Sequence, residues 1–237
     1  MQKIGMIGGL SWVSTAEYYK RLNQLMQERL GGVSSARIVL ESLNRQVMVE
    51  TVYDHKDEAS ACDQIQQACQ AVERAGADFI VISCNDMHRF VPQIEPQLTI
   101  PFLHIADATA DAIEKQGLKQ VALIGIRKTM EGDFYQSILK RRGISTIVPN
   151  EQERSYIHDR IYDELVHNVF TEKTRSGYQK IIRTLEDRGA EGIILGCTEI
   201  PLLLSADQVP IPSFSTTELH CVAAIERALT GSNEDRI

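Results

Sequence analysis

The 237-residue sequence has no long hydrophobic run. Its longest purely apolar stretches are a handful of residues, whereas about 20 are needed to span a bilayer, so it predicts no membrane partner. The opening letters, MQKIGMIGGLSW, hold only a short apolar run broken by glycine. Because a signal peptide carries a longer apolar segment, we expect a cytoplasmic protein.

The sequence also lacks several common binding signatures. Its five cysteines include no C-x-x-C pair and no Cys/His cluster, so we expect no metal and, in the cytoplasm, reduced thiols. A formal charge of -7 with scattered basic residues offers no counterpart to a phosphate backbone, which excludes nucleic acid as a partner. The absence of G-x-G-x-x-G and G-K-[ST] motifs disfavours a nucleotide site.

What the sequence does contain is a globular composition, 43% hydrophobic and 24% charged, with room for one large or two small domains. Short apolar runs alternate with longer amphipathic stretches, and this order predicts parallel sheets with helices on both faces. We expect strands at residues 3–7, 36–40, 79–83, 121–124, 146–148 and 192–195, and helices at 15–29, 59–75, 134–140, 156–168, 177–187 and 217–229.

The two halves of the chain resemble each other. At a constant offset of 113, the stretch around Cys84 matches the stretch around Cys197. An upstream match, IGMIG with VALIG, has an offset of 117, and a downstream Ile-Pro match has an offset of 111. Since the three matches keep their order and nearly their spacing, we infer a duplicated α/β unit.

The duplication predicts the architecture. We expect an α/β fold of two similar parallel-sheet domains related by a pseudo-twofold axis, with the active site in the cleft between them. The first domain would hold residues 1–103 plus 213–237, and the second residues 104–212. In parallel α/β sheets, ligands bind beyond the carboxyl ends of the strands, where each repeated cysteine stands.

Paired thiols at that place suggest a chemistry. One thiolate can remove a proton from a carbon while a thiol on the opposite side returns one, which inverts a stereocentre without any cofactor. The unperturbed thiol pKa of about 8.5 must then fall, and we expect the N–H dipoles of a following helix to lower it. A buried core cysteine is the ordinary alternative, and we assign Cys62, Cys69 and Cys221 to the core.

Other residues are candidates for holding a substrate. The loop Gly9, Leu10 and Ser11 follows the first strand, where backbone N–H groups bind carboxylates, although a tight turn explains it equally well. Arg45 is a candidate for a substrate carboxylate, with a solvated arginine as the more ordinary interpretation. Asn85 and Thr198 follow the two cysteines and suit capping or hydrogen bonding to a carboxylate. We expect His88 and His104 to be supporting, hydrogen-bonded histidines.

Five motifs together resemble the aspartate/glutamate racemase family over nearly the whole chain. They are I-G-M-I-G-G-L-S-W at the start, C-N-D-M-H at 84–88, P-F-L-H-I-A-D-A-T at 101–109, T-M-E-G-D-F-Y at 129–135 and G-C-T-E at 196–199. The third motif is similar to the aspartate racemase branch. The resemblance implies a two-domain amino-acid racemase, free of pyridoxal phosphate and metal, and commonly a homodimer.

The resemblance also implies roles. Cys84 and Cys197 would be the catalytic proton donor and acceptor, while Asn85, Thr198 and the loop from Gly9 to Ser11 would hold an aspartate or glutamate substrate. Two alternatives stay open. One is another reaction of the same superfamily, a decarboxylation or a cis–trans isomerisation, and the other is a non-catalytic two-lobed small-molecule binding protein.

One position departs from the family pattern. Asp86 stands where the family usually has threonine, and its repeat partner is Glu199. We therefore place both carboxylates among the substrate-binding residues. An extra carboxylate near the substrate would repel an acidic side chain, so we expect Asp86 to weaken the binding of aspartate and glutamate.

Overall fold

The computed structural model describes residues 1–231, and the chain divides into two units. Unit 1 holds residues 1–105 and the chain from His220 on, and unit 2 holds residues 106–219. Residues 232–237, which we expected in the first domain, lie outside the described residues. None of the described helices is both long and apolar enough to cross a membrane.

Unit 1 is built on a three-stranded parallel sheet in the order β2-β1-β3. Its strands are β1 (Ile4–Gly8), β2 (Ile38–Ser42) and β3 (Phe79–Ile82). Its helices are α1 (Trp12–Leu30), α2 (Arg45–Val49), the π-helix η1 (Glu50–Asp54), α3 (Glu58–Arg74), the 3-10 helix η2 (Asp86–Phe90), α4 (Val91–Ile94) and the 3-10 helix η3 (Glu95–Gln97).

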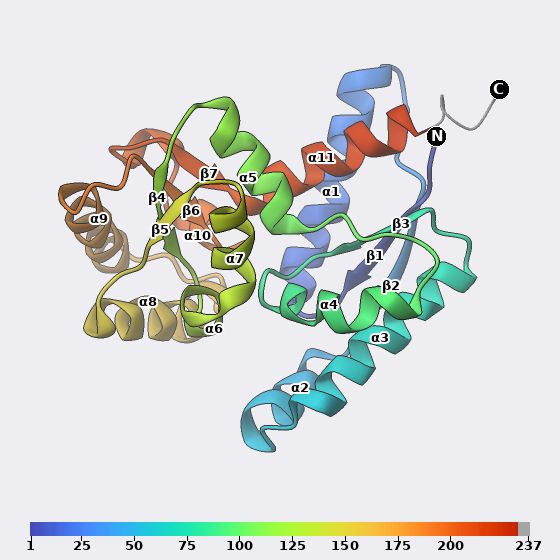
Figure 1. The fold of residues 1–237 in the computed structure, drawn as a ribbon, viewed down its shortest axis with the longest axis horizontal. Helices are drawn as coiled ribbons and strands as arrows, with labels where there is room; N and C mark the ends of the chain where they lie inside the picture. Colours follow the sequence, from blue (N-terminus) through green and yellow to red (C-terminus); the bar gives the residue numbers. More distant parts are fainter. Residues whose placement is uncertain (232–237) are drawn as a thin grey trace. The chain divides into compact units, whose positions relative to one another are not determined.

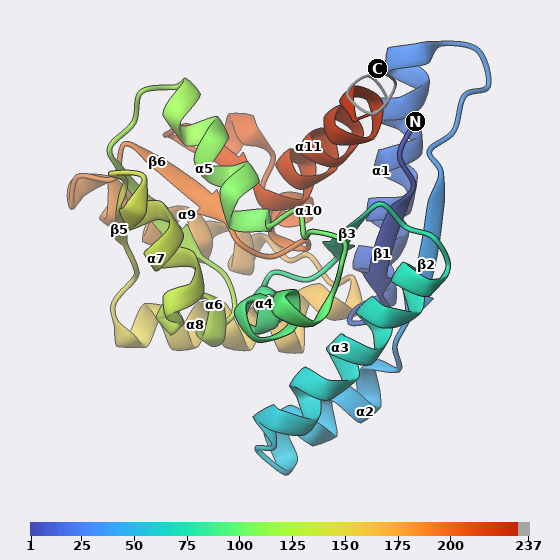
Figure 2. The same ribbon diagram turned by 45° about the vertical axis from the view of Figure 1, so that its right-hand side comes forward.

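The unit 1 sheet is covered on both faces, which explains why β1 and β3 are apolar along their whole length. Along β3, Ile80 and Ile82 pack with the buried face of α3, while Phe79 and Val81 pack with α1 and α11 (Thr216–Thr230). Figure 1 shows α1 and α11 on one side of this sheet and α3 on the other, and in Figure 2 β2 lies at the sheet edge.

Unit 2 has a four-stranded parallel sheet in the order β5-β4-β6-β7. Its strands are β4 (Gln120–Ile124), β5 (Ser145–Ile147), β6 (Gly192–Leu195) and β7 (Ser213–Ser215). Its helices are α5 (Ile105–Lys115), which starts at the unit boundary, α6 (Arg127–Glu131), α7 (Asp133–Arg141), α8 (Glu151–Asp163), η4 (Leu165–His167), α9 (Glu172–Asp187), α10 (Ile200–Leu203) and η5 (Ala206–Gln208).

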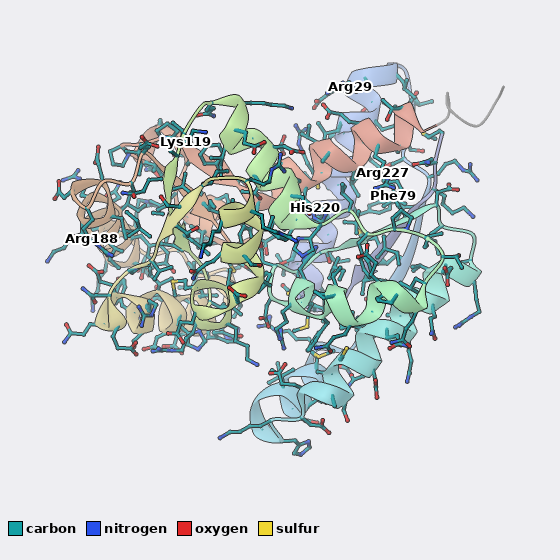
Figure 3. All side chains as sticks on the ribbon, in the orientation of Figure 1. Arg29, Phe79, Lys119, Arg188, His220 and Arg227 are labelled. Atoms are coloured by element: carbon teal, nitrogen blue, oxygen red, sulfur yellow. The ribbon has the colours of Figure 1, made fainter. Side chains whose placement is uncertain are left out.

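Several sequence-based boundaries differ from the structure, and the helix expected over 177–187 begins earlier, at Glu172. The expected helix over 156–168 is wrong at both ends, because a capping box of Asn150 and Glu153 starts α8 at Glu151 and the helix ends at Asp163. Residues 213–215, expected in the first domain, form β7 and pair with β6 in unit 2. The chain returns to unit 1 along α11, where Arg227 lies over the Phe79 ring at 5.0 Å (Figure 3).

The repeat inferred from the sequence is present in the backbone hydrogen bonds of each unit. The amide of Ser83 donates to Ile7 O at 2.9 Å, and the equivalent amide of Gly196 donates to Ile124 O at 2.8 Å. Because the next residue is a cysteine in both units, each thiol stands at the carboxyl end of the strand, β3 or β6, that pairs with the first strand of its unit.

The downstream Ile-Pro match is also repeated in the backbone. In unit 1 the amide of Ile80 donates to Pro101 O at 3.0 Å, and Phe102 forms an isolated parallel bridge with Ile80. In unit 2 the amide of Ile193 donates to Pro212 O at 2.8 Å. The Ile-Pro segment therefore lies beside β3 in unit 1 and beside β6 in unit 2. In unit 2 the residues after it form a full strand, β7.

Gly9 shows why the loop after β1 needs glycine. Its φ of 78° is in the left-handed region, and a Cβ there would lie 2.0 Å from Leu43 O. The amide of Leu43 in turn donates to Gly8 O at 3.0 Å, so the chain after β1 and the chain after β2 touch at one edge of the sheet.

A strained backbone alone costs about 1–3 kcal/mol. We expect Gly9→Ala to lower the free energy of unfolding by more than this, because the new methyl also meets the Leu43 carbonyl. Gly31→Ala is the matched control, since Gly31 has φ 74° with nothing within 4 Å of its Cβ position. Denaturant unfolding of both variants measures the difference. Equal losses would contradict the close approach to Leu43.

Candidate active site

Cys84 and Cys197 each follow a strand, β3 or β6, with one residue in between, and both are partly exposed and not in a disulfide. The elements after them are short. Cys84 is followed by the five-residue 3-10 helix η2, and Cys197 by the four-residue helix α10. The following helix whose N–H dipoles we expected to lower the pKa of each thiol is therefore only four or five residues long.

The surroundings of Cys84 favour the thiol over the thiolate. Burial raises the pKa of Cys84 to about 12, and the negative charge of Asp86 adds to that effect. The amide groups of Met87 and Asp86, which hydrogen-bond to the sulfur, and the charge of Arg89 act in the opposite direction. The expected lowering of the Cys84 pKa is therefore wrong for the protein without substrate, because desolvation outweighs the local amides.

Cys197 has a different neighbour. Its Sγ donates a hydrogen bond to Glu199 Oε2 at 2.9 Å, and Thr198 Oγ1 donates to the same oxygen at 2.9 Å. Glu199 is only 4% exposed, so the carboxylate that accepts from the thiol is buried. A carboxylate that accepts a thiol proton in a hydrogen bond is also placed to receive that proton.

Asp86 forms an ion pair rather than presenting an isolated charge. Its Oδ2 lies 2.5 Å from Arg89 Nη1, and Asp86 is 2% exposed. Arg89 also donates from Nη1 to Asp86 O and from Nε and Nη2 to Glu58 Oε2. The extra carboxylate that we expected to repel acidic substrates is thus compensated by a cation three residues away.

Asn85 and Thr198 do not cap the helices that follow them. Asn85 has helical dihedrals, makes no side-chain cap hydrogen bond and is 7% exposed. Thr198 gives its hydroxyl proton to Glu199 instead. Their capping role is therefore wrong, whereas their position beside the thiols is as expected.

The loop after β1 uses its own polar groups. The amide of Gly9 donates to Thr15 Oγ1 at 2.9 Å, so this amide is engaged inside the loop. Ser11 is the N-cap of α1, with its Oγ accepting from Ser14 N, and Leu10 is 8% exposed in the core. Gly9 therefore shapes the loop.

Thr15, which sequence reasoning missed, links this loop to the end of β3. Its hydroxyl donates to Ser11 O at 2.9 Å and lies 3.3 Å from the hydroxyl of Ser83, the residue before Cys84. Arg45 is the first residue of α2, two residues after Leu43. Its guanidinium makes no hydrogen bond or ion pair within residues 1–231. The structure thus brings the loop, Arg45 and Cys84 to one sheet edge.

Thr129 is a second residue that sequence reasoning missed. It is fully buried, and its Oγ1 has no hydrogen-bond partner in the described part of the chain. Its methyl lies 3.2 Å from where a Cβ on Gly196 would stand, beside the residue that precedes Cys197. A sequence signal existed, because Gly8 and Gly125 are equivalent in the repeat and each is followed within one or two turns by threonine.

Two buried histidines pack against each other in unit 1. His88 and His220 are both 0% exposed, with ring centroids 5.5 Å apart (Figure 3 labels His220). His220 donates from Nε2 to Leu103 O at 2.8 Å, and its Nδ1 accepts from the Tyr18 hydroxyl at 3.1 Å. Burial lowers the pKa of His220 to about 4, so the ring is neutral at pH 7.

A metal ion in a protein is held by a group of ligand side chains. Within residues 1–231, no three His, Cys, Asp or Glu side chains are grouped so that they could hold a metal ion. The polar groups at the two sheet edges are instead thiols, hydroxyls, amides and the Arg45 guanidinium, which suit a small molecule bearing carboxylate and ammonium groups.

The sequence profile of the Asp/Glu/Hydantoin racemases matches residues 7–224. The chain belongs to this racemase family. Because racemases interconvert enantiomers, membership places the chain among the isomerases. The resemblance seen in the five sequence motifs is confirmed.

Individual racemases are similar over nearly the whole chain. A Yersinia pestis protein provisionally named an Asp/Glu racemase is 40% identical, with a TM-score of 0.90, and the match covers 97% of this chain and 100% of that one. An aspartate racemase homologue from Pyrococcus horikoshii OT3 is 31% identical, with a TM-score of 0.84 and the same coverage. The broad specificity amino-acid racemase RacX of Bacillus subtilis (strain 168) is 24% identical over 212 residues, 88% of this chain and 90% of RacX.

The Asp86–Arg89 pair generates a stability prediction. We expect Arg89→Met to lower the free energy of unfolding by about 3–5 kcal/mol, because it leaves a buried carboxylate without its cation. The double variant Asp86→Asn/Arg89→Met should be more stable than Arg89→Met alone. Arg142→Met is the control, since its carboxylate partners are 38% to 55% exposed and its loss should cost under about 1 kcal/mol. Similar losses for the two arginines would contradict the buried pair.

His220 generates a prediction about pH. Its pKa is lower in the folded protein than its usual value of 6.5, so the unfolded chain takes up a proton first as pH falls. Stability from this group is complete above pH 6.5 and decreases by up to about 3 kcal/mol toward pH 4. Thermal unfolding should therefore depend less on pH in His220→Phe than in the parent protein. A parallel curve for His220→Phe would show that His220 does not contribute.

Proposed function

We propose that this member of the family is an amino-acid racemase acting on aspartate, glutamate or both, and that Cys84 and Cys197 exchange the α-proton without a cofactor. The observation that carries the proposal is the equivalent place of the two cysteines. Each comes directly after a residue, Ser83 or Gly196, whose amide donates a hydrogen bond to the first strand of its unit. A duplicated unit that keeps a thiol at both copies of that place suits a reaction that needs a base on each side of one carbon.

In the proposed reaction one cysteine, as thiolate, removes the α-proton of the bound amino acid and becomes a thiol. The carbon becomes planar, and the second cysteine, as thiol, donates its proton to the opposite face and becomes the thiolate. In the reverse direction the roles exchange, so protons and charge balance in both. This requires both sulfurs to reach the α-carbon of one bound substrate, each from its own face.

The resting thiols are suited to different parts of this cycle. Cys84 holds its proton firmly, with its pKa raised to about 12, so a substrate ammonium next to the sulfur is needed to stabilise its thiolate. Cys197 has Glu199 as hydrogen-bond acceptor at 2.9 Å, and transfer of its proton to that carboxylate would leave a thiolate without external base. Glu199 is therefore proposed to assist Cys197.

The same proposal assigns the binding groups. Arg45, whose guanidinium has no partner within residues 1–231, would pair with a substrate carboxylate, and Asn85, Thr198, Ser11 and the amide of Leu10 would donate to it. The charge of Asp86 is compensated by its ion pair with Arg89. An acidic substrate is supported by the names of the relatives, which include aspartate and glutamate racemases. The homodimer and the cytoplasmic location stay predictions.

Single substitutions test the two-thiol mechanism. We expect Cys84→Ser and Cys197→Ser each to lower racemisation of aspartate and glutamate by roughly 10²–10⁴-fold, the usual contribution of a positioned acid or base. Cys62→Ser is the matched control, because Cys62 lies in the α3 core at 7% exposure. Proton NMR in deuterated buffer follows both loss of the α-proton and optical inversion, with circular dichroism as a check on folding.

Racemisation that survives either catalytic substitution in a folded protein would overturn the two-base proposal. The same assay, run across a panel of amino acids, identifies the substrate. Activity that disappears with a chelator or a carbonyl reagent would overturn the cofactor-free mechanism but not the choice of cysteines.

A further inference from the structure

His88 is tied to the residue that carries the first thiol. Its Nδ1 lies 2.8 Å from the carbonyl oxygen of Cys84. Because a carbonyl oxygen only accepts, Nδ1 carries the proton and donates it, which leaves Nε2 as a bare acceptor. That atom is buried and has no hydrogen-bond partner among the described residues. The His88 ring thus hydrogen-bonds to the backbone of Cys84 and, in addition, to that of Asn85.

The bond closes the turn that surrounds the sulfur of Cys84. The amides of Asp86 and Met87 hydrogen-bond to that sulfur and favour its thiolate, while the backbone amide of His88 donates to Asn85 O at 3.1 Å. The Cys84 carbonyl shares its peptide plane with the amide of Asn85, and the Asn85 carbonyl shares its plane with the amide of Asp86. A side chain that hydrogen-bonds to the backbone of both Cys84 and Asn85 therefore helps to fix the amides around the thiol.

The His88 ring is itself held in place by packing. Its centroid lies 4.8 Å from that of His104 and 5.5 Å from that of His220, and His220 is bonded on both nitrogens. Burial and the two neighbouring histidines keep the pKa of His88 well below its usual value, so it is neutral at pH 7. It therefore acts as a rigid hydrogen-bond donor and not as a cation.

We propose that His88 is a positioning residue that, by holding the Cys84 carbonyl, aims the amides of Asp86 and Met87 at the Cys84 sulfur and so controls how readily this thiol ionises. The effect on the free thiol is independent of the reaction. Only its consequence for catalysis, a lower kcat with little change in KM, rests on the proposed function.

Alkylation of Cys84 by iodoacetamide, followed peptide by peptide with mass spectrometry between pH 7 and 10, measures thiolate formation without substrate. His88→Phe keeps a planar ring but removes the donor, and we expect it to slow alkylation of Cys84 about tenfold at pH 8, equivalent to a rise of about one pKa unit. His88→Asn should stay within about twofold of the parent, because its amide nitrogen takes the place of Nδ1 and keeps a donor for the carbonyl.

Two further variants separate positioning from packing. His220→Phe keeps an aromatic ring beside His88 but removes the hydrogen bonds of His220 to Leu103 and Tyr18, so it should lower the melting temperature and leave alkylation of Cys84 unchanged. His88→Gln places its amide nearer the Nε2 position and should behave like His88→Phe. If His88→Phe does not fold, faster alkylation in His88→Asn than in His88→Gln supports the proposal, and equal rates overturn it.

Two other results would also overturn it, namely parent-like alkylation in a folded His88→Phe, or equal slowing in His220→Phe. Failure of the proposed function has a different signature, because the parent protein would then racemise no amino acid while the alkylation rates still reported on His88.

Discussion

One backbone hydrogen bond in each unit determines the position of the cysteine that follows it. The amide of the residue before each cysteine donates to the first strand, at Ile7 O in unit 1 and at Ile124 O in unit 2. These bonds are buried, so a shift of one residue would leave an amide unsatisfied and turn every side chain of the strand to the opposite face. The thiol that follows is thereby fixed at the sheet edge, and the loops, hydroxyls and carboxylates of the site are arranged around it.

The two copies of this framework have diverged around the thiol. Unit 1 surrounds Cys84 with backbone amides, a compensated carboxylate and a neutral histidine, whereas unit 2 gives Cys197 a direct carboxylate acceptor. Ser83 and Gly196 continue the difference, since Ser83 meets the Thr15 hydroxyl while Gly196 leaves room for the methyl of Thr129. The backbone of the repeat is common to both units, and the electrostatics are not.

Sequence reasoning found the framework because buried parallel strands read as continuous apolar runs, and because the repeat preserved its glycines and Ile-Pro segments. It misplaced the start of α8, where the Asn150–Glu153 capping box is a local signal that the apolar pattern does not contain. The ion pair of Asp86 with Arg89 depends on how a 3-10 turn orients two side chains three residues apart. The raised pKa of Cys84 depends on burial, which only the folded chain defines.

The unlike surroundings of the two thiols have a kinetic consequence for a racemase. Enantiomers have equal free energy in water, so the equilibrium constant is one and the ratio kcat/KM must be the same for both directions. In the proposed two-thiol racemisation, an asymmetry between Cys84 and Cys197 therefore cannot favour one enantiomer at equilibrium. It is confined to matched changes in kcat and KM, so that the enantiomer turned over faster is also the one that needs the higher concentration to saturate the enzyme.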